Sequence, residues 1–227
     1  MARFDAIWLD AGGVLVLPDP TVLGPLLAYY GGSTDIDRHR RAHYAAMAVK
    51  SAQGADERDW VEYDRAYVAS VGVPDEDVAE AAEVLGRTRT ALLWRWPIPE
   101  TLEALAALAA KGVPLAVVSN ATGQIEDVLR RSGVCQVGPG RGVSVRCVVD
   151  STLVGVAKPD PGIFDHAAVH FPGVPRERIA YVGDSVTMDI GGATAAGLVP
   201  ILLDPYDDHA GAPFERITQL GDLLDQV

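Results

Sequence analysis

The sequence is short of basic residues and of cysteine. Its 227 residues include 19 lysines and arginines against 31 aspartates and glutamates, which gives a formal net charge of −12 at pH 7. Because a protein that binds phosphate backbones needs a basic face, this balance argues against a nucleic-acid partner. It leaves a small phosphorylated substrate open, since a metal ion and one lysine can offset carboxylate charge locally. The two cysteines, Cys135 and Cys147, lack the spacing of metal ligands, and in a reducing compartment we expect free thiols.

The chain also lacks a long apolar run. No window approaches the ~20 apolar residues that a membrane-spanning helix needs, and the amino terminus lacks the basic-then-apolar pattern of a secretion signal. These absences predict a cytoplasmic protein with no membrane partner. The length and a hydrophobic content of 48% allow one generous domain, or a main domain with a smaller insertion.

The first chemically informative stretch lies near the amino terminus. An apolar run at residues 4–9, broken only by Asp5, leads into Asp10 and then into the glycine pair Gly12-Gly13. This pattern predicts a buried strand that ends at a carboxylate, followed by a sharp turn. Ligands bind at the carboxyl ends of strands in an open parallel sheet, which is where Asp10 would lie. A turn residue without function gives the same local pattern, so the rest of the chain must decide.

Two kinds of segment follow. Residues 21–96 have the pattern of helices separated by glycine turns, without a convincing strand, and Pro97 and Pro99 close this segment. The rest alternates strand and helix, which is typical of an α/β fold with a doubly wound parallel sheet. We therefore assign residues 1–17 and 98–227 to an α/β core and residues 18–97 to an all-helical insertion after the first strand.

The core elements are placed by apolar runs and by the glycines that end helices. A run that is apolar throughout, such as residues 113–118, suits a parallel strand covered on both faces. The expected strands after the insertion are 113–118, 143–149, 179–182 and 199–203, and the expected helices are 101–111, 124–131, 160–170, 190–196 and 215–225.

Polar residues that could form a ligand-binding site follow the apolar runs. They are Asp10, Ser119 with Asn120, Lys158, and Asp184 with Asp189. Each of these residues could instead have a purely structural role. Serine and aspartate cap helices, aspartate stabilises a helix amino terminus, and lysine is usually solvated. Together, carboxylates, a hydroxyl, a lysine and glycine-exposed amides suit a magnesium ion and a phosphoryl group. An aspartate in such a site can attack phosphorus and form an aspartyl-phosphate.

The arrangement resembles the haloacid dehalogenase superfamily over essentially the whole chain. The matching segments are Asp10-Ala11-Gly12-Gly13-Val14, Ser119 after an apolar run, Gly155-Val156-Ala157-Lys158-Pro159-Asp160, and Gly183-Asp184-Ser185-Val186-Thr187-Met188-Asp189. The helical insertion resembles the cap of the family's first cap class, which closes over the site and selects substrates. The resemblance implies a Rossmann-like core, Mg²⁺ as cofactor, and hydrolysis of a small phosphomonoester. The expected partner is therefore a small phosphorylated metabolite, and the chain is expected to be a monomer or a homodimer.

The resemblance also implies a role for each site residue. Asp10 is expected to be the nucleophile, and Lys158 to steady both Asp10 and the phosphoryl group. The expected phosphate-binding residues are Gly13, Ser119, Asn120 and Lys158, and the expected metal-binding residues are Asp10, Gly12 through its carbonyl, Asp184 and Asp189. Asp184 is expected to be the direct ligand, with Asp189 acting through water.

The sequence departs from the family's pattern at Gly12. Family phosphatases carry a second aspartate there, which protonates the leaving oxygen and later activates water. In one interpretation the chain is still a phosphatase, and water, the substrate or a nearby carboxylate such as Asp19 takes over this role. In a second, the leaving group needs no proton, as in a dehalogenase or a phosphonatase-like hydrolase. The family's dehalogenases lack the full metal pair, so Asp184 and Asp189 favour phosphate over halide. In a third, the protein binds a phosphorylated ligand without useful turnover.

The insertion contains a basic cluster in an otherwise acidic chain: Arg38, His39, Arg40, Arg41 and His43. The leading interpretation is a solvated helix face. His39 and His43 share a face at spacing i, i+4, as a zinc pair does, but no third ligand is evident. The remaining interpretation is that Arg40 and Arg41 contact an anionic part of the substrate when the cap closes. Trp94 and Trp96, at the end of the insertion, are expected to pack at its hinge.

Overall fold

A parallel sheet of six strands forms the centre of the protein, whose computed structural model describes residues 2–54 and 59–227. The strand order is β10-β9-β8-β1-β4-β7, and every neighbouring pair is parallel. The strands are β1 (Ala6–Leu9), β4 (Leu115–Ser119), β7 (Val148–Asp150), β8 (Ile179–Gly183), β9 (Val199–Leu203) and β10 (Glu215–Ile217). The chain builds outward from β1 in both directions, which confirms the predicted doubly wound α/β fold.

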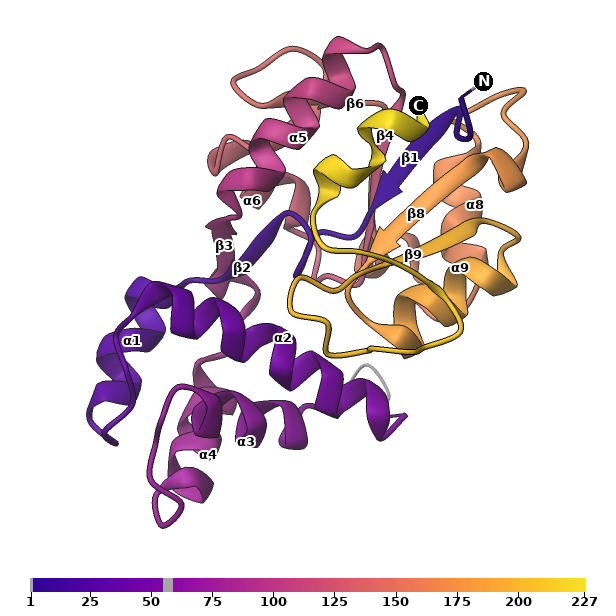
Figure 1. The fold of residues 1–227 in the computed structure, drawn as a ribbon. Helices are drawn as coiled ribbons and strands as arrows, with labels where there is room; N and C mark the ends of the chain where they lie inside the picture. The colour runs from indigo at the N-terminus through magenta and orange to yellow at the C-terminus, as the bar shows by residue number, and fades with distance from the viewer. Residues whose placement is uncertain (1, 55–58) are drawn as a thin grey trace.

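Helices cover both faces of this sheet (Figure 1). The helical segments of the core are α5 (Pro99–Ala110), α6 (Ile125–Arg131), α7 (Ser151–Val154), α8 (Gly162–Ala168), α9 (Gly191–Ala195) and the short turns η2 (Arg176–Arg178), η3 (Val186–Ile190) and η4 (Leu220–Gln226). α5 and η4 lie on one face, and α8 and α9 on the other. β1 alternates between the two layers, with Ile7 and Leu9 facing the first and Ala6 and Trp8 the second. Because both faces are covered, all of β1 is buried, as its continuous apolar run predicts.

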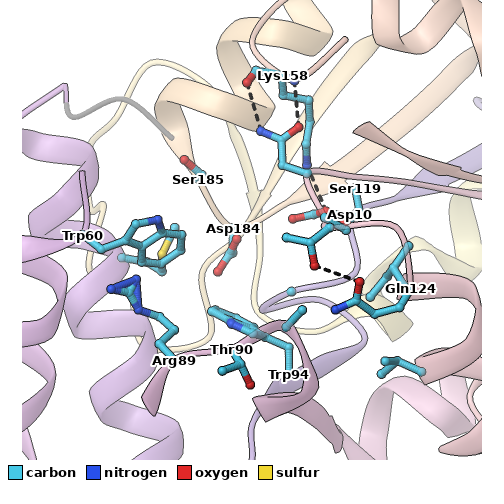
Figure 2. Close-up of a pocket in the computed structure, with 18 of the residues that line it drawn as sticks. Asp10, Trp60, Arg89, Thr90, Trp94, Ser119, Gln124, Lys158, Asp184 and Ser185 are labelled. Atoms are coloured by element: carbon cyan, nitrogen blue, oxygen red, sulfur yellow. Dashed lines mark hydrogen bonds and ion pairs between the residues drawn. The ribbon is translucent and has the colours of Figure 1, made fainter. Parts of the chain in front are cut away.

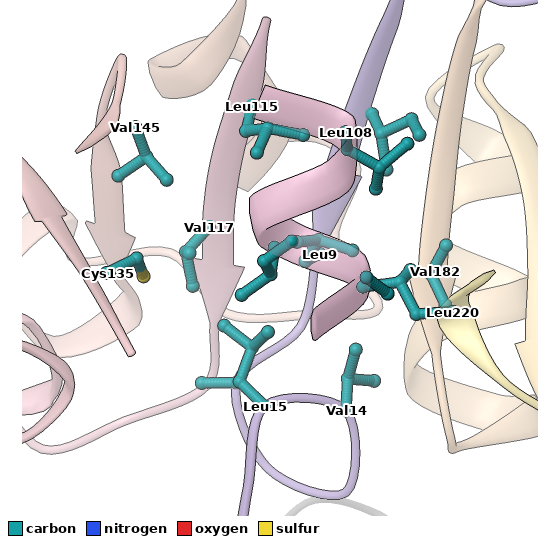
Figure 3. Packing of buried hydrophobic residues seen from close by; sticks show 14 of the residues in the cluster. Leu9, Val14, Leu15, Leu108, Leu115, Val117, Cys135, Val145, Val182 and Leu220 are labelled. Atoms are coloured by element: carbon teal, nitrogen blue, oxygen red, sulfur yellow. The ribbon is translucent and has the colours of Figure 1, made fainter. Parts of the chain in front are cut away.

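The apolar layer under α5 packs the carboxyl end of β1 against the rest of the core. Leu9 and Val117, from the adjacent strands β1 and β4, belong to the same buried cluster as Leu108 of α5 and Leu220 of η4 (Figure 3). The turn after β1 extends this layer, because Val14 and Leu15 are fully buried in it. Asp10, which directly follows β1 and precedes this turn, is thus held by apolar anchors on both sides.

The insertion forms a helical layer beside the core, drawn in indigo to magenta in Figure 1. Its helices are α1 (Pro20–Ala28), α2 (Ile36–Ala52), α3 (Val61–Ser70), α4 (Val78–Thr88) and the short η1 (Ala91–Leu93). It has an apolar cluster of its own, in which Leu27, Tyr67 and Leu85 are almost completely buried. α2 is the cap helix that runs along the core.

A two-stranded antiparallel ribbon, β2 (Val16–Pro18) with β3 (Trp94–Pro97), joins the cap to the core. The expectation that residues 21–96 hold no strand is therefore wrong for residues 94–96. The strand was not predicted because tryptophans next to proline give no alternating pattern of apolar and polar residues. The proposed division into residues 1–17 with 98–227 and residues 18–97 places one boundary inside β2 and the other directly after β3.

Three other element boundaries differ from those expected. Residues 143–149 form two strands, since β6 (Val143–Val145) pairs with β5 (Cys135–Val137) outside the main sheet while β7 joins it. A continuous apolar run does not show which sheet each half joins. Residues 215–217 form the edge strand β10, so the last helix begins only at Leu220. The helix expected from residue 190 begins earlier, with one π-helical turn (η3) before α9. None of the helices within the described ranges has the length and apolar character needed to cross a membrane.

Candidate active site

The predicted site residues meet at the carboxyl ends of the three central strands. Asp10 follows β1, Ser119 ends β4, and Asp184 follows β8. Because β1 lies between β4 and β8, these side chains face one cavity of about 240 Å³ (Figure 2). Lys158 joins them from the loop before α8, and residues of the cap line the opposite wall.

Three buried carboxylates form the centre of the site. Asp10, Asp184 and Asp189 each offer an oxygen, and these oxygens all lie within 4.8 Å of one another. Lys158 Nζ lies 2.9 Å from Asp10 Oδ1 and 2.7 Å from Asp189 Oδ1. One ammonium group against three carboxylates leaves an excess of negative charge out of contact with water. This donor set fits a hard divalent cation such as Mg²⁺, which oxygen ligands hold.

The pKa values in the site reflect the same imbalance. Burial raises the pKa of Asp10 to about 7, and the ion pair with Lys158 offsets only part of this effect. Burial also raises the pKa of Asp184, against a hydrogen bond from His43 that lowers it. Burial alone would lower the pKa of Lys158, but the carboxylates of Asp10 and Asp189 raise it, so that the lysine stays charged. A cation between the carboxylates would favour their ionised forms.

Asp189 is the most completely bonded of the three acids. Its Oδ2 accepts the backbone N–H groups of Asp184 and Ser185, at 3.1 and 2.9 Å. Its Oδ1 accepts from Lys158 Nζ and from the hydroxyl of Tyr181, at 2.7 and 3.1 Å. Gly183 makes this close approach possible, since a Cβ there would lie 2.1 Å from Asp189 Cγ. Asp189 therefore shapes the loop that carries Asp184, while Asp10 and Asp184 face the cavity.

Lys158 is held from its backbone as well as from its ammonium group. The Asn120 amide accepts the Lys158 N–H at 2.8 Å and donates to the Lys158 carbonyl at 3.0 Å. Lys158 Nζ also donates to Tyr181 at 2.9 Å, and the Tyr181 hydroxyl lies 2.9 Å from the carbonyl oxygen of Val118. Asn120 thus connects the end of β4 to the lysine loop. Its predicted contact with phosphate stays a prediction, as does that of Ser119, which lines the cavity.

Gly13 occupies a position that no other residue type fits. Its φ is +70°, and a Cβ there would lie 1.9 Å from Asp184 Oδ2. Its N–H donates to the Val16 carbonyl at 2.9 Å, and its own carbonyl accepts from the Tyr44 hydroxyl of the cap at 2.7 Å. The Gly13 amide is therefore engaged inside the turn, and its predicted role in phosphate binding stays a prediction.

The space beside Gly12 is filled by Trp94. A Cβ on Gly12 would lie 3.1 and 3.2 Å from two carbons of the Trp94 ring, so an aspartate there would force the indole to move. Trp94 lies in the ribbon that joins the cap to the core, and it also lines the cavity.

Asp19 is not a substitute acid. Its carboxylate accepts hydrogen bonds from Thr21 and Arg95 at the start of α1, and it does not line the cavity. Burial favours the neutral form of Asp19, but these hydrogen bonds outweigh it and hold its pKa below the ordinary value.

The cap contributes residues to the site that sequence reasoning missed. His43 Nε2 lies 2.9 Å from Asp184 Oδ2, and its Nδ1 lies 2.9 Å from the Tyr63 hydroxyl. The interpretation of this segment as a solvated helix face is wrong for both histidines, since His39 and His43 are 2% and 1% exposed. The spacing of the residues could have indicated this burial. Positions 39, 43, 47 and 50 share one face of a helix, and all four are buried on α2.

The other residues of the basic cluster point elsewhere. His39 bonds Tyr67 and the Ser33 carbonyl, each at 2.8 Å, so it does not share a ligand with His43. Among the described residues, only the three aspartates at positions 10, 184 and 189 form a group that could hold a metal ion. Arg40 pairs with Glu100 and Arg41 with Asp208, and neither arginine lines the cavity.

Comparison with known proteins finds relatives of this chain in both sequence and fold. A family model described as haloacid dehalogenase-like hydrolase matches residues 4–197. The phosphoserine phosphatase of Thermus thermophilus is 33% identical over 165 residues, which is 70% of this chain but only 61% of that protein. The glyceraldehyde 3-phosphate phosphatase of Methanopyrus kandleri is 32% identical over 167 residues, covering 69% of this chain and 67% of that protein. A structure of YfnB from Bacillus subtilis bound to magnesium has a TM-score of 0.61 at 19% identity, covering 98% of both chains, and shares the fold.

Proposed function

The chain belongs to the haloacid dehalogenase-like hydrolase family, and from this premise we propose that it is a magnesium-dependent phosphatase acting on a small phosphomonoester. The observation that carries the proposal is the buried set of Asp10, Lys158, Asp184 and Asp189 around one cavity. Two curated relatives named as phosphatases support it, and so does the magnesium bound by a protein of the same fold. Asp10, Asp184 and the Gly12 carbonyl would hold Mg²⁺, which supplies charge neutralisation for the phosphoryl oxygens when bound.

In the first half of the reaction, Asp10 acts as the nucleophile. An Oδ atom of Asp10 forms a bond to phosphorus while the bond from phosphorus to the leaving-group oxygen breaks. Lys158 stays charged beside the attacking carboxylate and stabilises the negative charge that builds on the phosphoryl oxygens. The Ser119 hydroxyl, at the end of β4, binds one of these oxygens.

In the second half, the oxygen of a water molecule forms a bond to phosphorus while the bond from phosphorus to Asp10 Oδ breaks. Asp10 is restored as a carboxylate, and the two water protons leave on the released phosphate or pass to solvent. The leaving oxygen of the first half must take a proton, and Gly12 has no side chain to supply it. Because Trp94 fills the adjacent space and Asp19 does not line the cavity, the proton comes from water or from the substrate itself. We therefore expect slow turnover, since a positioned general acid typically contributes about 10²–10⁴ in rate.

Phosphate release from a panel of small phosphomonoesters, with Mg²⁺ and with EDTA, tests the proposal. We expect activity that needs Mg²⁺ and that Asp10→Asn reduces by at least about a thousandfold. Asp165→Asn is the matched control, because Asp165 is an exposed aspartate that pairs with Arg176 on the core surface. Activity that EDTA leaves unchanged would contradict the proposal.

A second candidate is a hydrolase whose leaving group needs no proton, such as a dehalogenase. The contact between Gly12 and Trp94 favours it, because it leaves the cavity without a general acid at that position. Halide release from a 2-haloacid in EDTA would establish this alternative. Thermal stabilisation by phosphorylated ligands with no turnover across the panel would instead indicate a binding protein.

A further inference from the structure

We propose that Tyr181 is a positioning residue for the reaction. Its hydroxyl holds the ammonium group of Lys158 so that one N–H of the lysine faces Asp10 and the phosphoryl group that Asp10 attacks. This inference rests on the proposed function, because it assumes that the phosphoryl group lies against Asp10. Tyr181 lies outside the four sequence segments that resemble the family's motifs, so the motifs alone do not indicate such a role.

The ammonium group of Lys158 has as many oxygen neighbours as it has N–H donors. It donates to Asp189 Oδ1 at 2.7 Å and to the Tyr181 hydroxyl at 2.9 Å, and Asp10 Oδ1 lies 2.9 Å away. Two hydrogen bonds stop rotation about the Cε–Nζ bond, so they also set the direction of the remaining N–H. Lys158 and Asp10 line the cavity, whereas Asp189 and Tyr181 do not. The remaining N–H therefore faces the cavity side, where the Lys158 side chain extends toward Asp10 (Figure 2).

Tyr181 can hold the lysine because its own side chain is fixed. It lies in the middle of β8 and is fully buried, and its ring meets that of Phe164 of α8 edge-on with the centroids 4.8 Å apart. Its hydroxyl lies 2.9 Å from the Val118 carbonyl oxygen and 3.1 Å from Asp189 Oδ1. The single hydroxyl proton is directed at these two acceptors, which leaves an oxygen lone pair for the Lys158 N–H.

The two carboxylates attract the ammonium group by charge, whereas Tyr181 supplies direction. Once Asp10 has formed its bond to phosphorus, its carboxylate no longer carries a full negative charge. Asp189 keeps its charge and lies outside the cavity, so its attraction then pulls Lys158 away from the phosphoryl oxygens. The Tyr181 hydroxyl is uncharged and keeps its place in both halves of the reaction. It therefore resists this pull and leaves one lysine N–H for the phosphoryl group.

The kinetic test compares Tyr181→Phe with the wild type, in the full chain with Mg²⁺. Phenylalanine keeps the ring and its packing and removes only the hydroxyl. We expect kcat to fall by about 10-fold to 100-fold, the range for a hydrogen bond to a charged group, and KM to change much less because the charge of Lys158 remains. Tyr67→Phe is the matched control, since Tyr67 is a buried tyrosine whose hydroxyl bonds His39 at 2.8 Å and which does not line the cavity.

Nuclear magnetic resonance of the lysine ammonium groups tests the contact without turnover. The chain has three lysines, Lys50, Lys111 and Lys158, so in protein labelled with ¹⁵N-lysine the Lys158 signal is the one that Lys158→Arg removes. We expect Tyr181→Phe to speed rotation of this ammonium group by about tenfold, because a hydrogen bond that resists the rotation is lost. Tyr67→Phe should leave the rotation unchanged.

Three results would overturn the positioning role. The first is equal rotation of the Lys158 ammonium in the wild type and in Tyr181→Phe. The second is a wild-type Lys158 signal already broadened by rapid exchange with water, because N–H groups held by hydrogen bonds exchange slowly. The third is unchanged rotation together with Mg²⁺ binding weakened by about tenfold, the usual effect of losing a group that orients a metal-binding side chain. That result would mean that Tyr181 acts through Asp189.

The two readouts separate this role from the proposed function. Faster rotation in Tyr181→Phe, in a protein that hydrolyses no phosphomonoester, would refute the phosphatase and keep Tyr181 as the residue that orients Lys158. Turnover that needs Mg²⁺ and that Tyr181→Phe leaves unchanged would refute the positioning role and keep the phosphatase.

Discussion

His43 Nε2 lies 2.9 Å from Asp184 Oδ2, so a side chain of the cap touches one of the three clustered carboxylates of the core. When a bound cation keeps Asp184 ionised, its carboxylate only accepts hydrogen bonds, so His43 would donate from Nε2 and accept from the Tyr63 hydroxyl at Nδ1. The chain Tyr63–His43–Asp184 therefore fixes how Asp184 is presented. It connects three elements, α3, α2 and the end of β8.

His43→Ala is expected to weaken Mg²⁺ binding by about tenfold or more, the usual effect of removing a group that orients a metal-binding side chain. His43→Gln should recover part of the loss, because its amide keeps an N–H donor. His39→Ala is the matched control, since His39 is a buried histidine one turn earlier on α2 that bonds Tyr67 instead. Calorimetric titration with Mg²⁺ measures the effect, and equal affinities for both alanine variants would contradict it.

Gly13→Ala is expected to destabilise the protein by more than about 2 kcal/mol beyond the cost of Gly133→Ala. The two glycines have nearly the same φ, +70° and +72°, so both substitutions carry the same backbone strain. Only at Gly13 does the new Cβ collide with Asp184, because nothing lies within 4 Å of a Cβ on Gly133. Urea unfolding of both variants gives the difference, and similar losses would show that the collision relaxes at little cost.

Gly12→Asp alone is expected to lower activity, whereas Gly12→Asp combined with Trp94→Leu is expected to raise kcat above the wild-type value. The single change pushes a carboxylate against the indole, and the double change makes room for it. A general acid in place contributes about 10²–10⁴ in rate, so even a poorly aligned one should give about tenfold. The Trp94→Leu single variant is the control, and a double variant slower than it would refute the prediction.

The Mg²⁺-free protein is expected to lose stability as the pH rises from about 4 to about 7. Asp10 has a pKa of about 7 when folded and 3.8 as its ordinary value, so between these the folded state binds more protons than the unfolded one. Its contribution is bounded at roughly 4 kcal/mol, from about 1.36 kcal/mol for each pH unit between the two pKa values. Urea unfolding in EDTA at pH 5 and pH 8 measures the part that falls above pH 5, at most roughly 3 kcal/mol for about two pH units. Asp10→Asn should flatten the profile, and an unchanged slope in that variant would exclude Asp10 as its source.

Cys135 and Cys147 are expected to resist alkylation in the folded protein at pH 8. Both are buried, and burial raises their pKa values to about 12 and about 11, so almost no thiolate is present. Mass spectrometry after iodoacetamide treatment, with and without urea, tests this. Rapid labelling of either cysteine without urea would be inconsistent with the structure.

Much of the core followed from the sequence because its signals are local. The run before Asp10 and the run before Ser119 are apolar throughout, and a strand covered on both faces requires this. Parallel neighbours then bring their carboxyl ends to one edge of the sheet, so the sequence alone predicts that Asp10, Ser119 and Asp184 lie together.

The cap side of the site could not be predicted in this way. His43 lies in a segment whose polarity resembles a solvated helix face, and only the packing of α2 against other elements shows which of its positions are buried. Likewise, Gly12 and Trp94 are 82 positions apart in the sequence. Their contact exists because β3 pairs antiparallel with β2, which follows Gly12 closely in the chain. Such contacts are set by tertiary geometry and leave no periodic pattern.

The helix α2 makes three hydrogen bonds to loops at the cavity end of the core: His43 to Asp184, Tyr44 to the Gly13 carbonyl, and Ser51 Oγ to the Val186 N–H. Any movement that lifts α2 from the core breaks all three together. For the phosphatase proposed above, letting product out past α2 and disassembling the site would then be one event.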